Sequence, residues 1–436
     1  MMLIIIFASC NAQQKVEKEL SIPAKVWYVP ENNDYKNNDS DYSYNRMIES
    51  DNIAMFWHKE YGNNPIANSD STKRFDPEKA IIECERFYNY YVNDLKLVLK
   101  GQSFTDKYKL LIYVFGGDES TAFGGGEGNI GVLWTPATRI NKAPYGALAH
   151  EIGHSFQYLS NKDSKTGPKG SIMEMSAQYM LWQVYPEWMT FENYHLKDFL
   201  KGTHYAFLHP VNMYHSPYVL EYWSHKHGIE FWGNLSRSTQ EGEDLVMTYK
   251  RINNITQDQF NDQMFDASRK FITWDMTRIN AVSKPYRNIH RTKLIEIENG
   301  WHQIDSINTP QNYGYNGIKL SVPQSGTLIK LEFQGLAGTK GYNAIKTNMA
   351  GWRYGFLASL KNGERVYSKI YKSQKGTGEF KIPENTEYLW LVVSGAPTEH
   401  FPIIFNRHNK EQKLEEQWPY KIKLYGTTID SSKAPF

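Results

Sequence analysis

Cysteine is scarce in this sequence, and long hydrophobic runs and an excess of either charge are also missing. The 436 residues contain only Cys10 and Cys84, too few for a fold built on disulfides. The net charge is only +2, with 49 basic and 47 acidic residues, so no nucleic-acid partner is expected. After residue 10 no apolar run reaches the roughly 18 residues of a membrane span. The length therefore predicts two or three water-exposed domains.

The first ten residues, MMLIIIFASC, form a short apolar run that ends in small residues and a cysteine. This pattern resembles the lipobox of bacterial lipoproteins. The resemblance implies that residues 1–9 are a signal peptide and that Cys10 carries the lipid. We therefore expect anchoring in the bacterial cell envelope, at the outer membrane or cell surface, with the membrane contacted through Cys10.

Changes in residue pattern divide the rest of the chain. Residues 10–50 contain an Asn- and Asp-rich stretch and are expected to be an N-terminal strand and linker. Residues 51–284 mix apolar strands with amphipathic helices. Residues 293–436 carry short alternating strands separated by Gly, Pro and Asn, which predicts an all-β sandwich that folds on its own. Within it, Trp352 and Trp390 are interpreted as core residues or as platforms for sugar rings.

A strongly helical pattern begins near residue 76. Asp76 and Pro77 form a helix start, with a capping side chain followed by proline at the first helical position. Apolar residues at helical spacing continue to Val98, and Gly101 is expected to end the helix. Cys84 belongs to the apolar face, so we interpret it as a small buried residue and not as a nucleophile.

The clearest functional pattern is a pair of histidines four residues apart, His150 and His154, with Glu151 between them. On a helix both rings lie on one face and can bind one metal ion, while Glu151 flanks that face as a general base for zinc-assisted hydrolysis. The alternative is a satisfied pair of core histidines on an ordinary helix. We favour a Zn²⁺ site because the apolar stripe lies opposite both histidines. The stripe consists of Leu148, Ile152, Phe156 and Leu159.

The motif resembles that of the zincin peptidases, whose catalytic zinc usually has three protein ligands. The metzincin continuation is absent, because Ser160 occupies the position of its third histidine. Glu174, separated from His154 by 19 residues, resembles the glutamate ligand of gluzincins with thermolysin-type spacing. One turn later the chain has Gln178 where thermolysin-like enzymes carry an Asp that orients a histidine. Ser171-x-x-Glu174 is also a capping-box pattern, but we assign Glu174 to the metal because zinc would otherwise have only two protein ligands.

A wider resemblance supports a peptide substrate. The form H-E-I-G-H-S-F-Q, with Trp223, Trp232 and the late Trp418-Pro419-Tyr420, is similar to secreted bacterial zincin-like proteins of unknown function. The motif also resembles that of enhancin-type peptidases, which cleave mucin-like glycoproteins. These resemblances imply an extended peptide or glycopeptide as the substrate.

The same resemblance predicts two further parts of the site. Zincins bind substrate along an edge strand, for which we expect residues 129–135, with Gly124-Gly125-Gly126 as a turn before it. They also stabilise the oxyanion with a Tyr or His from the helical lower half, which here offers a cluster of aromatic residues and histidines. We favour Tyr218 and His215 in this role.

The sequence therefore predicts an α+β fold: a zincin-like domain with a mixed sheet and a helical lower half, followed by the sandwich. Its predicted function is that of a gluzincin-type zinc metallopeptidase acting on extracellular proteins or glycoproteins. The alternative is a surface lipoprotein that binds glycans or proteins and whose zincin domain holds a metal without turnover. Retention of Glu151 argues for the enzyme, because a binding protein has no chemical need for a base there.

Overall fold

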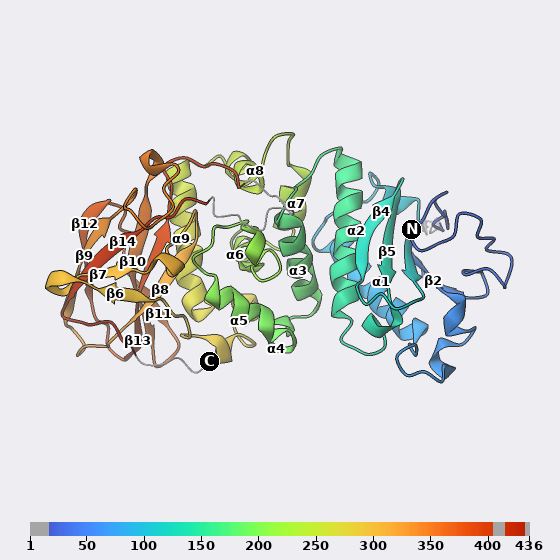
Figure 1. The fold of residues 1–436 in the computed structure, drawn as a ribbon, viewed down its shortest axis with the longest axis horizontal. Helices are drawn as coiled ribbons and strands as arrows, with labels where there is room; N and C mark the ends of the chain where they lie inside the picture. The colour runs from blue at the N-terminus through green and yellow to red at the C-terminus, as the bar shows by residue number, and fades with distance from the viewer. Residues whose placement is uncertain (1–16, 404–414, 432–436) are drawn as a thin grey trace, which may run out of the picture.

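The computed structural model describes residues 17–403 and 415–431. The predicted signal peptide and Cys10 lie outside the described residues. Figure 1 shows a sheet flanked by two helices at one end, a group of helices in the middle and a β-rich region at the other end. Among the described residues, no helix has the length and apolar character needed to cross a membrane. The mixed α+β composition agrees with the prediction.

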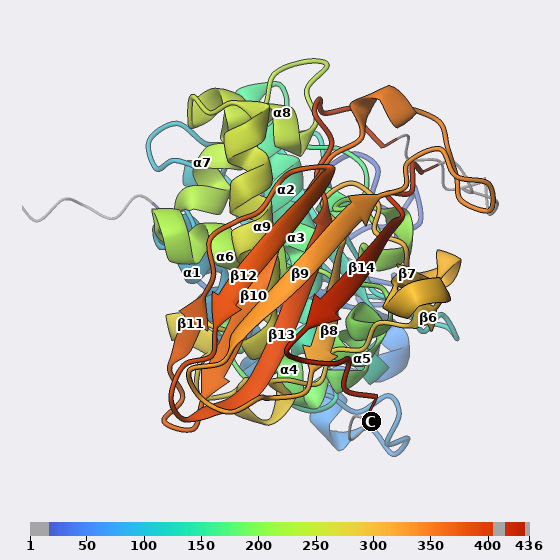
Figure 2. The same cartoon turned by 90° about the vertical axis from the view of Figure 1, so that its left-hand side faces the viewer.

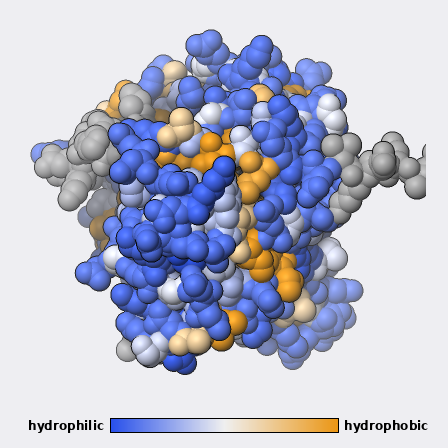
Figure 3. Space-filling model, turned by 90° about the vertical axis from the view of Figure 1, so that its right-hand side faces the viewer, coloured by the Kyte–Doolittle hydropathy of each residue, from blue (hydrophilic) through white to orange (hydrophobic). Residues whose placement is uncertain are grey.

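The N-terminal sheet has five strands in the order β1-β2-β3-β5-β4. Strands β2, β3 and β5 run parallel, and β1 and β4 are antiparallel edges. The bounds are β1 Met47–Glu49, β2 Ile53–Trp57, β3 Leu110–Val114, β4 Phe123–Glu127 and β5 Ile130–Thr135. One face packs on helices α1 (Pro77–Asn93) and α2 (Gly146–Ser164). The other face packs on the incoming chain through Val26 and Tyr42. Figure 3 shows this end of the molecule as mostly hydrophilic, crossed by a narrow hydrophobic band.

The edge strand next to helix α2, which carries His150 and His154, differs from the prediction. Residues 129–135 lie inside the sheet as β5, and the glycine run expected as a turn is the edge strand β4. Close packing explains the glycines: a Cβ on Gly124 would lie 1.9 Å from the Glu151 carbonyl oxygen, and one on Gly126 would lie 2.2 Å from the Tyr158 ring. The glycines therefore let β4 lie directly against helix α2.

Helix α1 (Pro77–Asn93) begins as predicted, with the Asp76 side chain accepting a hydrogen bond from the Lys79 N–H. It ends before Val98 and Gly101 because the chain turns at Lys96, whose φ is 50°. The apolar residues beyond Asn93 are still buried, in a loop. Cys84 is fully buried, and burial raises the pKa of its thiol, which agrees with a packing role.

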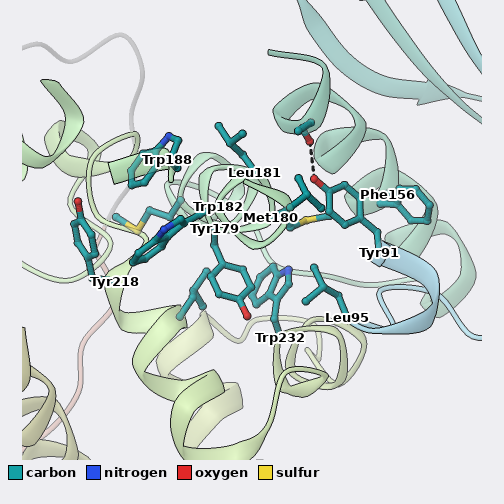
Figure 4. Packing of buried hydrophobic residues seen from close by; sticks show 14 of the residues in the cluster. Tyr91, Leu95, Phe156, Tyr179, Met180, Leu181, Trp182, Trp188, Tyr218 and Trp232 are labelled. Carbon is teal, nitrogen blue, oxygen red and sulfur yellow. Dashed lines mark hydrogen bonds between the residues drawn. The ribbon is translucent and has the colours of Figure 1, made fainter. Parts of the chain in front are cut away.

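Helix α2 (Gly146–Ser164) buries the predicted apolar stripe, and α3 (Ile172–Val184) packs beside it. Further helices complete the middle of the molecule. They are α4 (Trp188–Phe191), α5 (Asn193–Lys201), α6 (Tyr218–His227), α7 (Phe231–Arg237), α8 (Leu245–Ile252) and α9 (Gln257–Thr273). Figure 4 shows their aromatic core and the hydrogen bond that Tyr91 donates to the Ala149 carbonyl, which ties α1 to α2.

The C-terminal region consists of two sheets packed face to face (Figure 2). One has the order β11-β10-β13-β8 and the other β12-β9-β14-β7-β6. The bounds are β6 Leu294–Glu296, β7 His302–Ile304, β8 Tyr315–Leu320, β9 Leu328–Gly335, β10 Trp352–Leu360, β11 Arg365–Tyr367, β12 Lys375–Lys381, β13 Thr386–Gly395 and β14 Tyr420–Tyr425. Trp352 and Trp390 have no exposed surface, so they are core residues and not sugar platforms.

The first of these sheets also packs against the helices. Leu357, Trp390 and Val392 belong to the same apolar core as helix α9, and the Trp390 indole N–H donates to Asn288. One sheet is therefore covered on both faces, by the second sheet and by α9. Independent folding of residues 293–436 stays a prediction, and this shared core is the main obstacle to it.

Candidate metal site

Helices α2 and α3 bring three predicted ligands together. The Nε2 atoms of His150 and His154 lie 3.1 Å apart. One Glu174 carboxylate oxygen lies 3.3 Å from the first and 3.1 Å from the second. Two ligands held about 2.0–2.1 Å from a zinc ion in tetrahedral geometry are themselves about 3.3 Å apart. The donor atoms of these residues are therefore spaced as a tetrahedral metal requires, and a His₂Glu set leaves a fourth position open.

Glu174 contacts the two histidines and does not cap the start of α3. Ser171 precedes α3 without any side-chain capping bond, so the capping box does not form. Burial disfavours the charged carboxylate, but the contacts with His150 and His154 outweigh that effect and hold the pKa of Glu174 well below its usual range. A negative oxygen between two ring nitrogens is the arrangement expected of a metal ligand set.

Glu151 lies beside this set. The possible ligand atoms of His150, Glu151 and His154 all lie within 4.8 Å of one another. Burial raises the pKa of the Glu151 carboxyl, whereas the nearby histidines and a backbone hydrogen bond from Gly124 act in the opposite direction. We assign the ligand role to Glu174 and not to Glu151, because the Glu174 oxygen contacts both Nε2 atoms. A carboxylate beside the open position is suited to accept a proton.

His154 is oriented by a glutamine on its own helix. The Gln157 side-chain oxygen lies 2.8 Å from His154 Nδ1. The Gln157 amide nitrogen donates to the Met173 carbonyl and to the Ser176 hydroxyl, each at 2.8 Å. Because a backbone carbonyl can only accept, the amide orientation is fixed and its oxygen must face the ring. Nδ1 therefore carries the proton, and Nε2 presents its lone pair to a metal.

His150 is oriented by Gln178, the residue that replaces the expected Asp. Its amide oxygen lies 3.3 Å from His150 Nδ1, and its nitrogen lies 3.3 Å from the Tyr214 carbonyl, which fixes the amide in the same way. The same nitrogen lies 3.0 Å from His195 Nε2. Two neutral amides thus set both histidine tautomers, in place of the carboxylate of thermolysin-like enzymes.

The Gln178 contact continues to a second pair of histidines. His195 Nδ1 lies 2.7 Å from His215 Nδ1. Burial, with the neighbouring His215, lowers the pKa of His195 to about 4, so its ring is neutral near pH 7. Since its Nε2 accepts from Gln178, its Nδ1–H donates to His215. In this series of hydrogen bonds, every donor points away from the candidate metal ligands.

The two residues predicted to stabilise the oxyanion, Tyr218 and His215, lie away from the three candidate ligands. Tyr218 is wrong for this role: it is fully buried and packs 4.7 Å from the Trp274 ring and 5.5 Å from the Trp182 ring, centroid to centroid. Figure 4 shows Tyr218 on the far side of this core from Phe156 of helix α2. Among the described residues, hydrogen bonds link His215 to His150 through His195 and Gln178, so His215 supports a candidate ligand instead of facing substrate.

Tyr214 is the aromatic residue that does lie at the site. Its ring stacks against His150 at a centroid distance of 6.3 Å, and it is 37% exposed. The sequence placed it in the aromatic and histidine cluster, but nothing in its spacing separated it from its neighbours. The contact arises from the loop before α6, whose path a sequence pattern does not show.

The edge strand presents backbone groups beside the site. Strands β4 and β5 are joined by a two-residue turn, so Glu127 and Ile130 form a hydrogen-bonded pair. Pairing alternates along an antiparallel ladder, so Gly124 and Gly126 direct their N–H and C=O groups away from β5. The open edge of β4 therefore starts next to Glu151.

A family model matches residues 12–431 and is described as a family of unknown function, DUF6055. The chain belongs to this family. None of the curated proteins matches it. The family description itself assigns no activity to the metal site.

Several solved structures are weakly similar to the chain. The M60 catalytic domain with two CBM51 domains from Clostridium perfringens ZmpB aligns over 91% of this chain and 60% of that one, at 10% identity and a TM-score of 0.26. The CBM22-1 xylan-binding domain of Paenibacillus barcinonensis Xyn10C covers 33% of this chain and 82% of its own, at 9% identity and a TM-score of 0.19. The Yersinia pseudotuberculosis-derived mitogen aligns over 33% and 92%, with the same identity and TM-score. These scores are too low to carry an argument about function.

Proposed function

We propose that the protein is a zinc-dependent peptidase that hydrolyses peptide bonds in extracellular proteins or glycoproteins. The observation that carries this proposal is the convergence of His150, His154 and Glu174 on one point, with both ring tautomers set by amides. A zinc ion bound there would supply Lewis-acid polarisation of the scissile carbonyl. The donor set fits zinc by ligand type, number and spacing.

The residues around that point have separate tasks in the proposed reaction. Glu151 takes a proton from the attacking water and passes it to the leaving amine. An extended substrate pairs with the outward backbone groups of Gly126 and with the outward carbonyl of Gly124, which add it to the sheet as a further strand. Tyr214 replaces Tyr218 and His215 as the side chain proposed to face the oxyanion, because it contacts His150 and is exposed.

Cleavage profiling tests this function. Purified protein is incubated with a library of peptides and mucin-type glycopeptides, with and without a chelator, and a Glu151→Gln variant serves as the control. We expect cleavage that needs both the metal and Glu151. Metal binding without cleavage of either set would favour the alternative, a glycan- or protein-binding surface lipoprotein.

We also propose that Cys10 anchors the protein in the bacterial envelope. The support is the sequence pattern alone, since this residue lies outside the described part. Labelled palmitate should enter the protein in a bacterial host, and Cys10→Ser should abolish labelling. Release of an unlabelled soluble form from the complete gene would contradict the anchor.

A further inference from the structure

Arg139 is an exposed cation near the start of edge strand β4. It ends the short 3-10 helix Ala137–Arg139, in the segment between β5 and α2. Its neighbours Ala137 and Ile140 are buried, whereas Arg139 itself is exposed. The guanidinium Nε donates a hydrogen bond to the Ser120 carbonyl at 2.8 Å. The backbone is therefore anchored on both sides, and the side chain reaches the loop that leads into β4.

This hydrogen bond places Arg139 near the candidate metal site. Ser120 lies shortly before Phe123, the first residue of β4. The next residue, Gly124, packs against Glu151 and contributes a backbone hydrogen bond to its carboxyl. The four residues from Ser120 to Gly124 span at most roughly 14 Å. Arg139 therefore lies at the end of β4 that adjoins Glu151.

The start of helix α5 approaches the same guanidinium from the helical half. Burial raises the pKa of the Glu192 carboxyl, while the charges of His150 and Arg139 act in the opposite direction. Arg139 also acts against the rise that burial causes in the pKa of the Tyr194 phenol. Tyr194 is 56% exposed, and its ring lies 4.1 Å from the His195 ring, centroid to centroid. Arg139 thus lies between the loop before β4 and the helices that orient the candidate ligands.

Most of the hydrogen-bonding capacity of Arg139 is unused within residues 17–403 and 415–431. A guanidinium has five N–H donors, and only the Nε donor of Arg139 has an acceptor in these ranges. Arg139 also forms no ion pair with a carboxylate of the described chain. Glu192 is near, but its carboxylate accepts from the Trp188 indole at 2.6 Å and lies 3.6 Å from His195 Nε2. The two terminal nitrogens can therefore bind a carboxylate in bidentate geometry.

The direction of an added strand determines which part of a substrate meets Arg139. Strand β4 (Phe123–Glu127) runs away from Arg139. Antiparallel pairs are about two to three times as common as parallel ones, and an antiparallel substrate runs toward Arg139. Such a substrate passes Gly126, then Gly124 beside Glu151, and then reaches the guanidinium. Residues on the C-terminal side of the cleaved bond are therefore the ones that meet it.

We propose that Arg139 is a specificity-determining residue that binds a substrate carboxylate on the C-terminal side of the cleaved bond. This inference rests on the proposed peptidase function and names the substrate class that the site prefers. The planar guanidinium matches a carboxylate through two parallel N–H···O bonds. The carboxylate can belong to an acidic side chain, to the C-terminus of the peptide or to an acidic sugar on it. A doubly charged phosphate is disfavoured, because the nearby Glu192 carboxylate would repel the second charge.

Peptide pools that differ in one group test the proposal on the full chain. Octapeptide pools of mixed sequence, amidated at the C-terminus, carry Glu, Gln or Lys at one fixed position, and mass spectrometry of the products locates each cut. We expect Glu after the cut to raise kcat/KM at least about fivefold over Gln, and added salt to reduce this preference. Arg139→Gln should remove the preference by slowing only the cleavage of Glu pools. Arg139→Glu should reverse it, so that Lys pools are cleaved faster than Glu pools.

Two further comparisons identify the source of the carboxylate. Neutral octapeptides with a free or an amidated C-terminus test the chain end, and O-glycopeptides with or without sialic acid test a sugar carboxylate. A preference for the acidic member of any comparison, lost in Arg139→Gln, supports the proposal. Loss of the bond to Ser120 alone would slow acidic and neutral substrates equally. Lys142→Gln is the matched control, because it removes one exposed positive charge from the same segment and should keep the preference.

Binding is measured separately, so that failure of the peptidase proposal can be distinguished. The same substrates, labelled, are bound to Glu151→Gln protein and followed by fluorescence anisotropy. An Arg139-dependent preference in binding without any cleavage by the wild type would reject the peptidase and retain the carboxylate site. Equal cleavage and equal binding of acidic and neutral members in all comparisons would overturn the carboxylate site alone. An equal loss in Lys142→Gln, or an Arg139-dependent preference for acids before the cut, would also overturn it.

Discussion

Two contact regions of the molecule differ in the groups that meet there: the polar seam between α2 and α3, and the apolar seam between α9 and the β11-β10-β13-β8 sheet. Between α2 and α3, polar groups meet: ring nitrogens, a carboxylate and two glutamine amides. Between α9 and the β11-β10-β13-β8 sheet, Trp390 and its neighbours form an apolar contact. At the edge of this contact, Arg353 bonds to Asp258 and Asp262. Buried polar atoms are stable only with partners, whereas apolar surface is satisfied by packing. The first seam is therefore suited to hold the proposed metal ion, and the second is complete in itself.

The largest effect is expected from removing the ligands of the polar seam. His150→Ala/His154→Ala should lose the metal and all cleavage, because a single carboxylate cannot hold zinc in a catalytic geometry. Elemental analysis of purified protein measures the loss. Protein that contains no zinc despite adequate supply during expression would contradict the proposed zinc site.

Glu151→Gln should retain the metal and the melting temperature but lower turnover at least about a hundredfold, as expected for the loss of a general base. Steady-state kinetics with matched zinc content measures this effect. Turnover equal to the wild type would require another base.

Glu174→Gln should lower zinc affinity at least about tenfold, because a neutral amide is a poorer ligand than a carboxylate. Melting of the chelated variant should barely change, since Ser171 makes no side-chain cap that depends on this residue. Competition with a chelator gives the affinity. Wild-type zinc affinity in this variant would transfer the third ligand to another residue.

Gln178→Ala should lower zinc affinity about tenfold, at the lower end of the range for residues that orient metal ligands. It removes the acceptor that fixes His150 Nδ1 and the donor to His195. Gln183→Ala on the same helix is the matched control, because Gln183 donates to Glu221 and does not contact the ligands. An equal loss in both variants would indicate damage to α3 and not to ligand orientation.

The smallest expected effect concerns the apolar seam. Arg353→Met removes the ion pairs with two partly exposed aspartates, so the loss of stability should be only about 1 kcal/mol, or about 2–4 °C in melting temperature. Zinc affinity should not change. A fall in zinc affinity would show that the two seams are coupled.

The meeting of the three candidate ligands was predictable because helix geometry alone brings His150 to His154, and the spacing to a following helix brings in Glu174. The residues that orient these side chains could not be predicted from the sequence. The sequence showed only that Gln178 replaces an expected Asp, and its bonds to the Tyr214 carbonyl and His195 depend on tertiary contacts. Tyr218 and His215 were favoured over Tyr214 within one cluster of candidates, because local periodicity does not show where a side chain lies beyond its own helix.

The fold was predictable where a pattern has one structural meaning. Strands β3 and β5 and the start of α1 follow from apolar runs and from Asp76-Pro77. The glycine run was misread because a strand without side chains has no alternation to detect. Its glycines reflect contact with α2, a long-range constraint. The apolar residues after Asn93 resembled a continuing helix although they are buried in a loop.

The packing of α9 also has an evolutionary consequence. Because Leu357, Trp390 and Val392 share a core with the helices, recombination at the apparent boundary near residue 293 would separate both partners of that contact. A transplanted sandwich would carry an uncovered apolar face. The remaining helices would lose the sheet that covers their own apolar face. The shared core therefore disfavours exchange of the C-terminal region as a module. Substitutions on the two sides of this contact should change together within the family.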